Sequence, residues 1–299
     1  HESGSEQIRL SLPTRLREYM RDTYLIDDRY LFLKNKLFKD IDQIKQLHIY
    51  PPKDKTCEVI IVYETKDAEE LPDNGHYLSI DLGLHNLMTC YDSKGSTFIM
   101  GREYLSIARK YDKEIKRVQS QWATAQTRKG VRYPMPSKHL LSLHQKKRDS
   151  VKDYLHKATR SLTDYCVDQD IRTVIIGDLK NIRKGKDLGA KNNQKLHGLP
   201  YEKIISMLEY KLKQKGIRLV KQEESYTSQC SPYSKCVSAE YAEKVNRKER
   251  GLYVSDKKVF NADAVGAFNI MRKYFAVSGI KKEMSVSGLE NTKLKKVAV

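Results

Sequence analysis

The chain has 299 residues, of which 39% are hydrophobic and 31% charged, and its 56 Lys and Arg outnumber 38 Asp and Glu to give a formal net charge of +18. No apolar stretch approaches the roughly 20 residues that a membrane helix needs, and the first residues, "HESGSEQIRL", show no signal peptide, so we expect a cytoplasmic protein without a membrane partner. The positive charge runs along the whole chain rather than along one amphipathic helix, which favours nucleic acid as the partner over a membrane surface.

The five cysteines are an odd number for a disulfide-bonded secreted protein and indicate a reducing compartment. Three of them, Cys57, Cys90 and Cys166, lie inside apolar runs, so we expect them to be small buried side chains. The other two, Cys230 and Cys236, lie in a polar stretch.

The chain begins with a β-rich region over residues 1–75. "QIRLSLP", "QLHIYPP" and "CEVIIVYET" are strand candidates, the last being rich in β-branched residues. The polar segment 67–75 carries Pro and Asn-Gly turn chemistry and predicts a domain boundary.

Three short strands follow in quick succession, "YLSIDL", "NLMTCY" and "STFIM", joined by hairpin-sized links that contain Gly. This pattern predicts an antiparallel meander. Helices are then expected over about 103–125 and 137–168, with Ser137 as the N-cap of the second, which has one apolar face and one basic face.

The remaining pattern alternates strands and helices: a strand over 172–179, a helix over about 201–214 closed by Gly216, a strand over 217–224, and a helix over 261–274. Helical crossovers force parallel pairing of these two strands with the sheet. The fold class predicted is therefore α/β, in the ribonuclease-H-like order, and we expect its first strand at the sheet centre with the fourth and fifth beside it on one side.

Acidic residues stand where the strands of this sheet end. Asp81 ends the first strand, Asp178 the fourth, and Glu223 and Glu224 the fifth, while Asp263 lies in the first turn of the last helix. Taken singly, such residues are turn formers or helix-dipole partners. Taken together at one edge, they would repel one another unless cations lay between them, and three carboxylates around two Mg²⁺ ions are suited to hydrolysis of a phosphodiester.

The stretches "SIDLGLHNL", "VIIGDLKNIR" and "NADAVGAFNI", with "EESYTSQC" between the last two, resemble the three nuclease motifs and the intervening segment of the TnpB family. This family comprises RNA-guided DNA endonucleases that insertion sequences encode and that are related to type V CRISPR effectors. The resemblance spans about residues 76–275. It implies a RuvC-like nuclease domain over 76–275, with a helical insertion at about 103–168, and a partial β-barrel wedge domain over 1–75. Residues 276–299 are expected to be a basic, flexible tail.

By this resemblance Asp81 and Asp263 match the first and third catalytic aspartates. The second motif departs from the family, because Gly177 stands where most members have glutamate. A subgroup uses instead a glutamate about 45 residues later, which Glu224 matches. Asp178 is the rival third ligand, and Glu223 should point the opposite way on the strand.

The family also usually carries a zinc ribbon, built from two Cys pairs, between its second and third motifs. Here only Cys230 and Cys236 are present, and two cysteines at this spacing do not make a four-ligand site. We therefore expect no zinc, and a small lid over about 225–260 in place of the ribbon.

The resemblance implies an RNA-guided, Mg²⁺-dependent endonuclease of a transposable element, with guide RNA and double-stranded target DNA as partners, in a prokaryotic cytoplasm at the nucleoid, as a monomer or homodimer. A nuclease-inactive RNA-guided repressor and a guide-free structure-specific nuclease are the alternatives. The candidate nucleic-acid contacts are Lys180, Arg183, Lys184, Lys186, Lys191, Lys195, Arg148, Lys152, Arg160 and Tyr226.

Overall fold

The computed structural model describes residues 7–34, 43–51, 57–64, 68–178, 200–249 and 251–297. The chain divides into two compact units, His1–Lys66 and Asp67–Val299. The boundary therefore falls before the polar segment 67–75 and not after it as expected. Two contacts explain this: the Leu71 N–H donates to the Gly216 carbonyl at 2.8 Å, and Asn74 Nδ2 donates to the Asp170 carbonyl at 2.8 Å.

The first unit holds four strands and one helix in its described residues. Strand β1 (Gln7–Ser11) pairs with β2 (Tyr30–Lys34), and β3 (Gln43–Ile49) pairs with β4 (Val59–Glu64), both antiparallel. Helix α1 (Thr14–Tyr24), which the sequence analysis did not anticipate, lies between β1 and β2 in the chain. The described strands make two separate two-stranded sheets, so the partial barrel stays a prediction.

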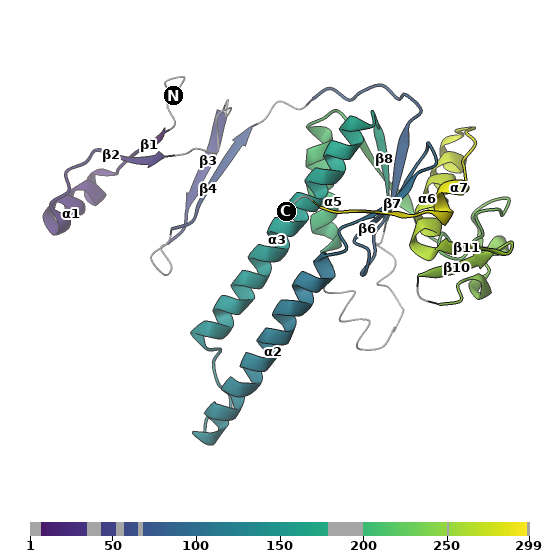
Figure 1. Ribbon diagram of the computed structural model, residues 1–299. Coiled ribbons are helices and arrows are strands. Elements are labelled where there is room, and N and C mark those ends of the chain that lie inside the picture. The colour runs from purple at the N-terminus through teal and green to yellow at the C-terminus, as the bar shows by residue number, and fades with distance from the viewer. Residues whose placement is uncertain are drawn as a thin grey trace. The chain divides into compact units, whose positions relative to one another are not determined.

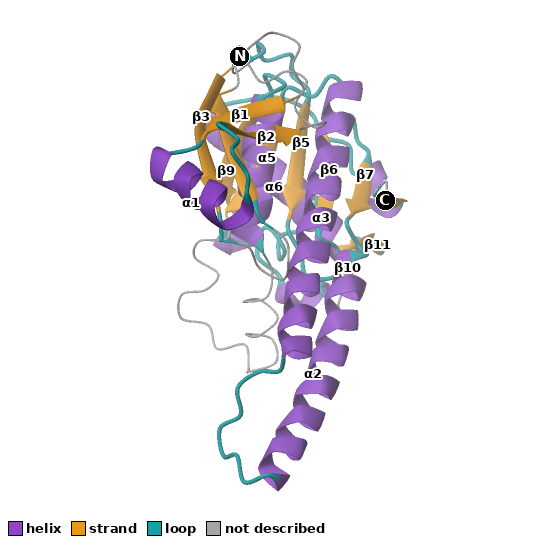
Figure 2. Ribbon diagram, turned by 90° about the vertical axis from the view of Figure 1, so that its left-hand side faces the viewer, coloured by secondary structure: helices purple, strands orange, loops and turns teal. Residues whose placement is uncertain are grey.

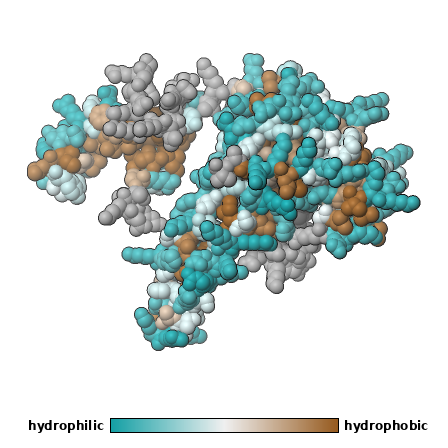
Figure 3. Space-filling model, viewed as in Figure 1, coloured by the Kyte–Doolittle hydropathy of each residue, from teal (hydrophilic) through white to brown (hydrophobic). Residues whose placement is uncertain are grey.

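Apolar side chains cover much of the surface of this first unit, where Figure 3 shows brown patches. Helix α1 buries none of its residues, and Phe32 and Ile60 are among the exposed side chains. Cys57 is exposed as well, so the expectation that it is buried is wrong. The physical reason is that most of the neighbouring strand β4 is itself exposed, which leaves no interior for the thiol to enter.

The second unit is built on a six-stranded mixed sheet in the order β12-β7-β6-β5-β8-β9 (Figure 1). The meander β5 (Tyr77–Asp81), β6 (Met88–Asp92) and β7 (Thr97–Met100) is antiparallel, as expected from its short links.

Strand β8 (Thr173–Asp178) pairs parallel with β5, and β9 (Arg218–Glu223) pairs parallel with β8. The predicted order of these five strands is therefore confirmed. It brings the carboxyl ends of β5, β8 and β9 to one edge of the sheet.

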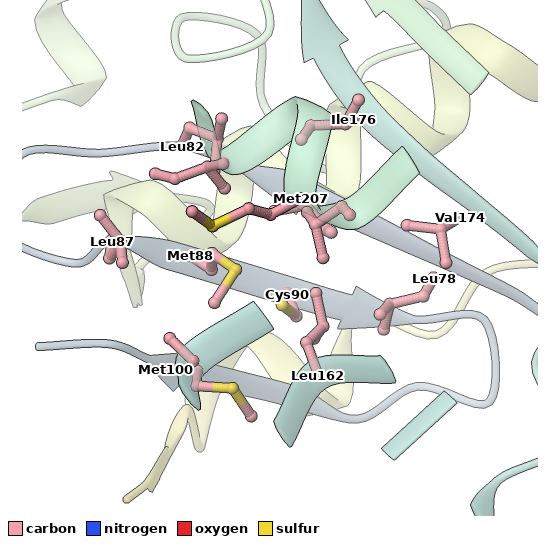
Figure 4. Close-up of a cluster of buried hydrophobic side chains, with 14 of the residues drawn as sticks. Leu78, Leu82, Leu87, Met88, Cys90, Met100, Leu162, Val174, Ile176 and Met207 are labelled. Atoms are coloured by element: carbon pink, nitrogen blue, oxygen red, sulfur yellow. The ribbon is translucent and has the colours of Figure 1, made fainter. Parts of the chain in front are cut away.

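Helices cover both faces of the sheet: α3 (Lys138–Asp168) and α5 (Tyr201–Lys213) on one, and α6 (Ala262–Ser278) on the other (Figure 1). Alternation along β5 divides its side chains between the two faces. Leu78 and Ile80 join the core under α3 and α5, where Figure 4 shows Leu78 with Leu162 and Met207. Tyr77 joins the core under α6.

A pair of long helices projects from the sheet, formed by α2 (Tyr104–Arg128) and the first half of α3 (Figure 2). Ser137 caps α3 as expected, since its side chain accepts a hydrogen bond from the Leu140 N–H at 3.1 Å. A small apolar cluster joins the two helices: Ile115, Val118, Leu140 and Leu143. Along the described ranges, no helix is both long and apolar enough to cross a membrane.

The segment 225–260 lies against α6 and ends in a hairpin, β10 (Leu252–Ser255) and β11 (Lys258–Asn261). Two short 3₁₀ turns, Ala239–Tyr241 and Lys244–Asn246, precede the hairpin. Tyr253 and Phe260 are buried against α6. The segment is attached to that helix by packing and by the side chain of Asn269, which donates to the carbonyls of Thr227 and Cys230, both at 2.8 Å.

The expected flexible tail over 276–299 is wrong for the residues that the structure describes. Helix α6 continues to Ser278, α7 (Ser287–Glu290) follows, and β12 (Lys293–Lys295) pairs parallel with β7 as the edge strand of the sheet. Two apolar side chains among the lysines of this tail are buried and anchor it: Leu289 and Val297 are 0% and 4% exposed. Two well-separated apolar residues produce no periodicity, so the sequence pattern misses them.

Replacing these anchors tests the ordered tail. We expect Leu289→Ala to lower the free energy of unfolding by about 2–4 kcal/mol, because a fully buried leucine leaves a cavity. Leu294→Ala, in the same tail but 59% exposed, is the matched control and should change it by less than about 0.5 kcal/mol. Urea denaturation measures both, and equal effects of the two variants would contradict the anchored tail.

Candidate active site

Three acidic side chains from distant parts of the chain meet beyond one edge of the sheet. Asp81 ends β5, Glu224 follows β9 directly, and Asp263 lies in the first turn of α6. Asn261 fixes the start of α6, because its Oδ1 accepts hydrogen bonds from the N–H groups of Asp263 and Ala264 at 3.0 and 3.1 Å.

The pKa of Asp81 depends on both of the other acids. Burial raises the pKa of its carboxyl well above the ordinary value, and the charges of Glu224 and Asp263 raise it further, while Arg247 opposes the shift. The close fit extends to α6: a Cβ on Gly266 would lie 2.4 Å from Asp81 Oδ2. The helix can approach the carboxylate this closely only because residue 266 has no side chain.

Glu224 occupies the space above Gly177. A Cβ on Gly177 would lie 1.6 Å from Glu224 Oε1, so a side chain at 177 and the carboxylate of Glu224 exclude one another. Oε1 is buried and has no hydrogen-bond partner among the described residues. Burial, together with the charges of Asp178 and Glu223, raises the pKa of Glu224 to about 7. A buried acceptor without a donor is what a cation would satisfy.

The two neighbouring glutamates point in different directions, as the alternation of a strand predicts. Glu223 is exposed and its carboxylate accepts hydrogen bonds from Lys273 Nζ and from the Ser225 N–H, the latter at 2.6 Å. Asp178 is paired with Glu223 in the strand register and is half-buried. Asp178 therefore lies near Glu224 and stays its rival as the third ligand.

Two residues at this site were missed by the sequence analysis. Asn86 Nδ2 donates to Asp263 Oδ2 at 2.7 Å, and Arg247 Nη2 lies 3.9 Å from Asp263 Oδ1. Asn86 reaches the site from the tight β5–β6 hairpin, in which a Cβ on Gly83 would lie 2.8 Å from the Asn86 carbonyl oxygen. The position of Asn86, three residues after Gly83 in this link, is a pattern from which the sequence could have indicated a role for it. The irregular segment around Arg247 offers no such pattern.

The donor set suits Mg²⁺, which prefers carboxylate oxygens. Among the described residues, no three His, Cys, Asp or Glu side chains lie close enough together to hold a single ion. Asp81 is nevertheless close enough to both Glu224 and Asp263 for their charges to raise its pKa.

The expected nucleic-acid contacts are only partly described. Lys180, Arg183, Lys184, Lys186, Lys191 and Lys195 lie outside the described residues. Arg148, Lys152 and Arg160 are exposed on α3, although Arg160 Nε also donates to Asp164 at 2.9 Å. Tyr226 is 41% exposed two residues beyond Glu224 and has a left-handed backbone, with φ of 66°.

The two cysteines of segment 225–260 differ in environment. Cys230 is buried and its thiol lies 3.3 Å from the Ser238 carbonyl, whereas Cys236 is exposed. Burial raises the pKa of the Cys230 thiol, which disfavours the thiolate that zinc binding needs.

Residues 60–183 match the OrfB_IS605 family, described as a probable transposase, and residues 201–270 match the Cas12f1-like TNB domain. The two matches, with models of a transposase family and of a Cas12f1-like domain, support a TnpB-like family for this chain. No curated protein sequence matches it significantly.

Among solved structures, the Cas12f1-sgRNA-target DNA complex matches with a TM-score of 0.50 and 18% identity, covering 71% of this chain and 52% of that one. The CRISPR-Cas12f ternary complex gives 0.48 and 20%, covering 77% and 43%. The first likeness supports the fold alone. The chain spans about half the length of the Cas12f1 chain.

A double-mutant cycle tests the exclusion between residues 177 and 224. We expect Gly177→Ala to lower the free energy of unfolding by about 1–3 kcal/mol, because the added methyl group overpacks against the carboxylate. In a Glu224→Ala background the same change should cost less than about 0.5 kcal/mol. Urea denaturation gives both values, and an equal cost in the two backgrounds would show that Glu224 does not fill this space.

The raised pKa of Glu224 predicts a pH-dependent stability. The ordinary pKa is 4.5 and the folded value about 7, so the folded protein holds a proton that the unfolded chain releases. Ionisation therefore costs stability as pH rises through this window, and the full penalty is present above it. Without divalent cations, Glu224→Gln should raise the Tm at about pH 8 and much less at about pH 5.

Glu223→Gln is the matched control for this measurement. Although burial opposes it, hydrogen bonds from Lys273 and Ser225 lower the pKa of Glu223. This variant should not become more stable at the higher pH. A Tm of Glu224→Gln that stays at or below the parent's at both pH values would contradict a buried, destabilising charge at residue 224.

Proposed function

We propose that the protein is an RNA-guided, Mg²⁺-dependent DNA endonuclease of a transposable element, with a RuvC-like nuclease domain. The observation that carries this proposal is the meeting of Asp81, Glu224 and Asp263 at one edge of the sheet, with a buried, unpartnered Glu224 oxygen in the place that Gly177 leaves open. A cluster of like charges is costly to fold and is accounted for by a site that binds cations.

Asp81, Glu224 and Asp263 would hold the metal, with Asp178 as the rival of Glu224. Two bound Mg²⁺ ions would supply activation of the attacking water and stabilisation of the leaving oxygen. Asn86 donates a hydrogen bond to Oδ2 of Asp263, so Oδ1 is the oxygen left for a metal ion. Arg247, which faces Oδ1, is placed to bind a phosphate oxygen of the strand to be cut.

Guide RNA and double-stranded target DNA are the proposed partners. Support comes from the likeness to a TnpB-like family, from the printed composition of the Cas12f1 complex, and from the net charge of +18. Base pairing would supply sequence specificity, while the exposed basic residues of α3, Arg148, Lys152 and Arg160, and the basic segment after β8 would bind phosphates. Tyr226, exposed next to Glu224, would stack on a base of the cleaved strand.

The finer domain assignment belongs to the same proposal. The first unit, His1–Lys66, would contribute to a wedge domain, and segment 225–260 would act as a lid that keeps its place without zinc. The protein would act in the cytoplasm at the nucleoid, as a monomer or homodimer.

Two other functions share this fold. A repressor that binds DNA without cutting would be expected to lack a catalytic acid, and both aspartates are present. A guide-free structure-specific nuclease would not need RNA. The deciding experiment is a denaturing gel of the purified protein followed by a cleavage assay with Mg²⁺. One bound RNA species together with a cut target supports the proposal. Bound RNA without cutting supports the repressor, and cutting without RNA supports the guide-free nuclease.

Substitution of the acids tests the assignment of the site. Asp81→Ala and Asp263→Ala should each reduce cleavage at least about 100-fold while RNA binding stays unchanged, because the metal ligands are lost but the basic surface is not. Glu224→Gln should have the same effect, and Asp178→Asn a smaller one. Cleavage by Glu224→Gln at the parent's rate, with loss in Asp178→Asn, would reverse the choice of third ligand.

A further inference from the structure

Lys273 binds the chain on both sides of Glu224. It lies on α6, and its Nζ donates to the carboxylate of Glu223 and to the carbonyl of Ser225, the latter at 3.0 Å. Its side chain is only 18% exposed. Lys273 therefore donates hydrogen bonds to the residue before Glu224 and to the residue after it.

The same short segment is closed by further hydrogen bonds. Glu223 Oε1 accepts from the Ser225 N–H at 2.6 Å. The carbonyl of Glu224 accepts from the Thr227 N–H at 3.1 Å and from the Thr227 hydroxyl at 2.8 Å. These contacts make a tight turn in which the backbone of Glu224 is held at its carbonyl and at both flanking residues.

This turn matters because Glu224 stands beyond the sheet. Among the described residues, the last rung of the pairing between β8 and β9 joins Asp178 to Glu223, and Glu224 lies just outside strand β9. The direction of its side chain depends on the turn that follows.

Helix α6, which holds the turn through Lys273, also carries Asp263. Lys273 and Asp263 lie on one helix, α6, ten residues apart, or roughly 15 Å along the axis. Because a helix is stiff over this length, the contact of Lys273 with the turn ties the position of Glu224 to that of Asp263.

We propose that Lys273 and Glu223 form a positioning latch that sets Glu224 at the correct distance from Asp263 for both to bind divalent cations. This inference rests on the proposed function. The first glutamate of the "EES" motif is then the structural one and the second the functional one. Neither Lys273 nor Glu223 contacts the metal or the DNA.

The sizes of the effects on stability and on function distinguish this positioning role from a purely structural one. Glu223 is 51% exposed, and an exposed ion pair contributes at most about 1 kcal/mol to stability. A residue that orients a metal ligand typically affects metal affinity or activity about 10–100-fold. A latch therefore predicts a large functional loss with little change in stability.

The test compares Lys273→Met and Lys273→Arg with the parent, each as the complex with its RNA. Lys273→Met keeps the apolar stem and should weaken Mn²⁺ binding, measured by calorimetry, and lower kcat about 10–100-fold, with KM for DNA and Tm near the parent's. Lys273→Arg should recover much of the loss, because it can still donate to both oxygens. Glu223→Gln breaks the latch from its exposed end and should lose Mn²⁺ affinity in the same way, which decides the matter if Lys273→Met is poorly folded.

Lys281→Met is the matched control, since it removes one exposed positive charge just beyond α6 and should change neither Mn²⁺ binding nor kcat. Parent-like Mn²⁺ affinity and kcat in both Lys273→Met and Glu223→Gln would overturn the latch while the proposed function stands. A parent that neither binds Mn²⁺ nor cleaves would overturn the proposed function, and the latch with it.

Discussion

Repulsion among neighbouring carboxylates is the constraint on which the rest of this structure depends. Asp81 is half-buried against α6, and its pKa is raised by burial and by the charges of Glu224 and Asp263. Like charges gathered where water is partly excluded need a compensating interaction. The sheet order, the start of α6 and the turn after β9 all serve to bring these charges together and hold them there.

Two glycines leave the room that these carboxylates need. Gly266 lets α6 approach Asp81, and Gly177 leaves the space that Glu224 fills. The site can therefore take its third acid from the end of β9 instead of from β8. The strands are adjacent and parallel, so a carboxylate that reaches across from the neighbouring strand end enters the same region.

The order of the five strands could be predicted from the sequence, because link lengths decide which neighbours pair and alternation decides which face is buried. The same reasoning separated Glu223 from Glu224. The tail could not be predicted: Leu289 is a single buried anchor among lysines, and the edge position of β12 is decided by long-range pairing with β7. Arg247 and Lys273 act through contacts between segments far apart in the chain, which no local pattern reveals.

The central claim is that Asp81, Glu224 and Asp263 share divalent cations. Anomalous scattering from Mn²⁺ in crystals of the protein with its RNA tests this most directly. Mn²⁺ peaks among the carboxylates of Asp81, Glu224 and Asp263, with all three residues as ligands, are the predicted result. Absence of any peak among these three carboxylates, or a peak bound through Asp178 with Glu224 turned away, would contradict it.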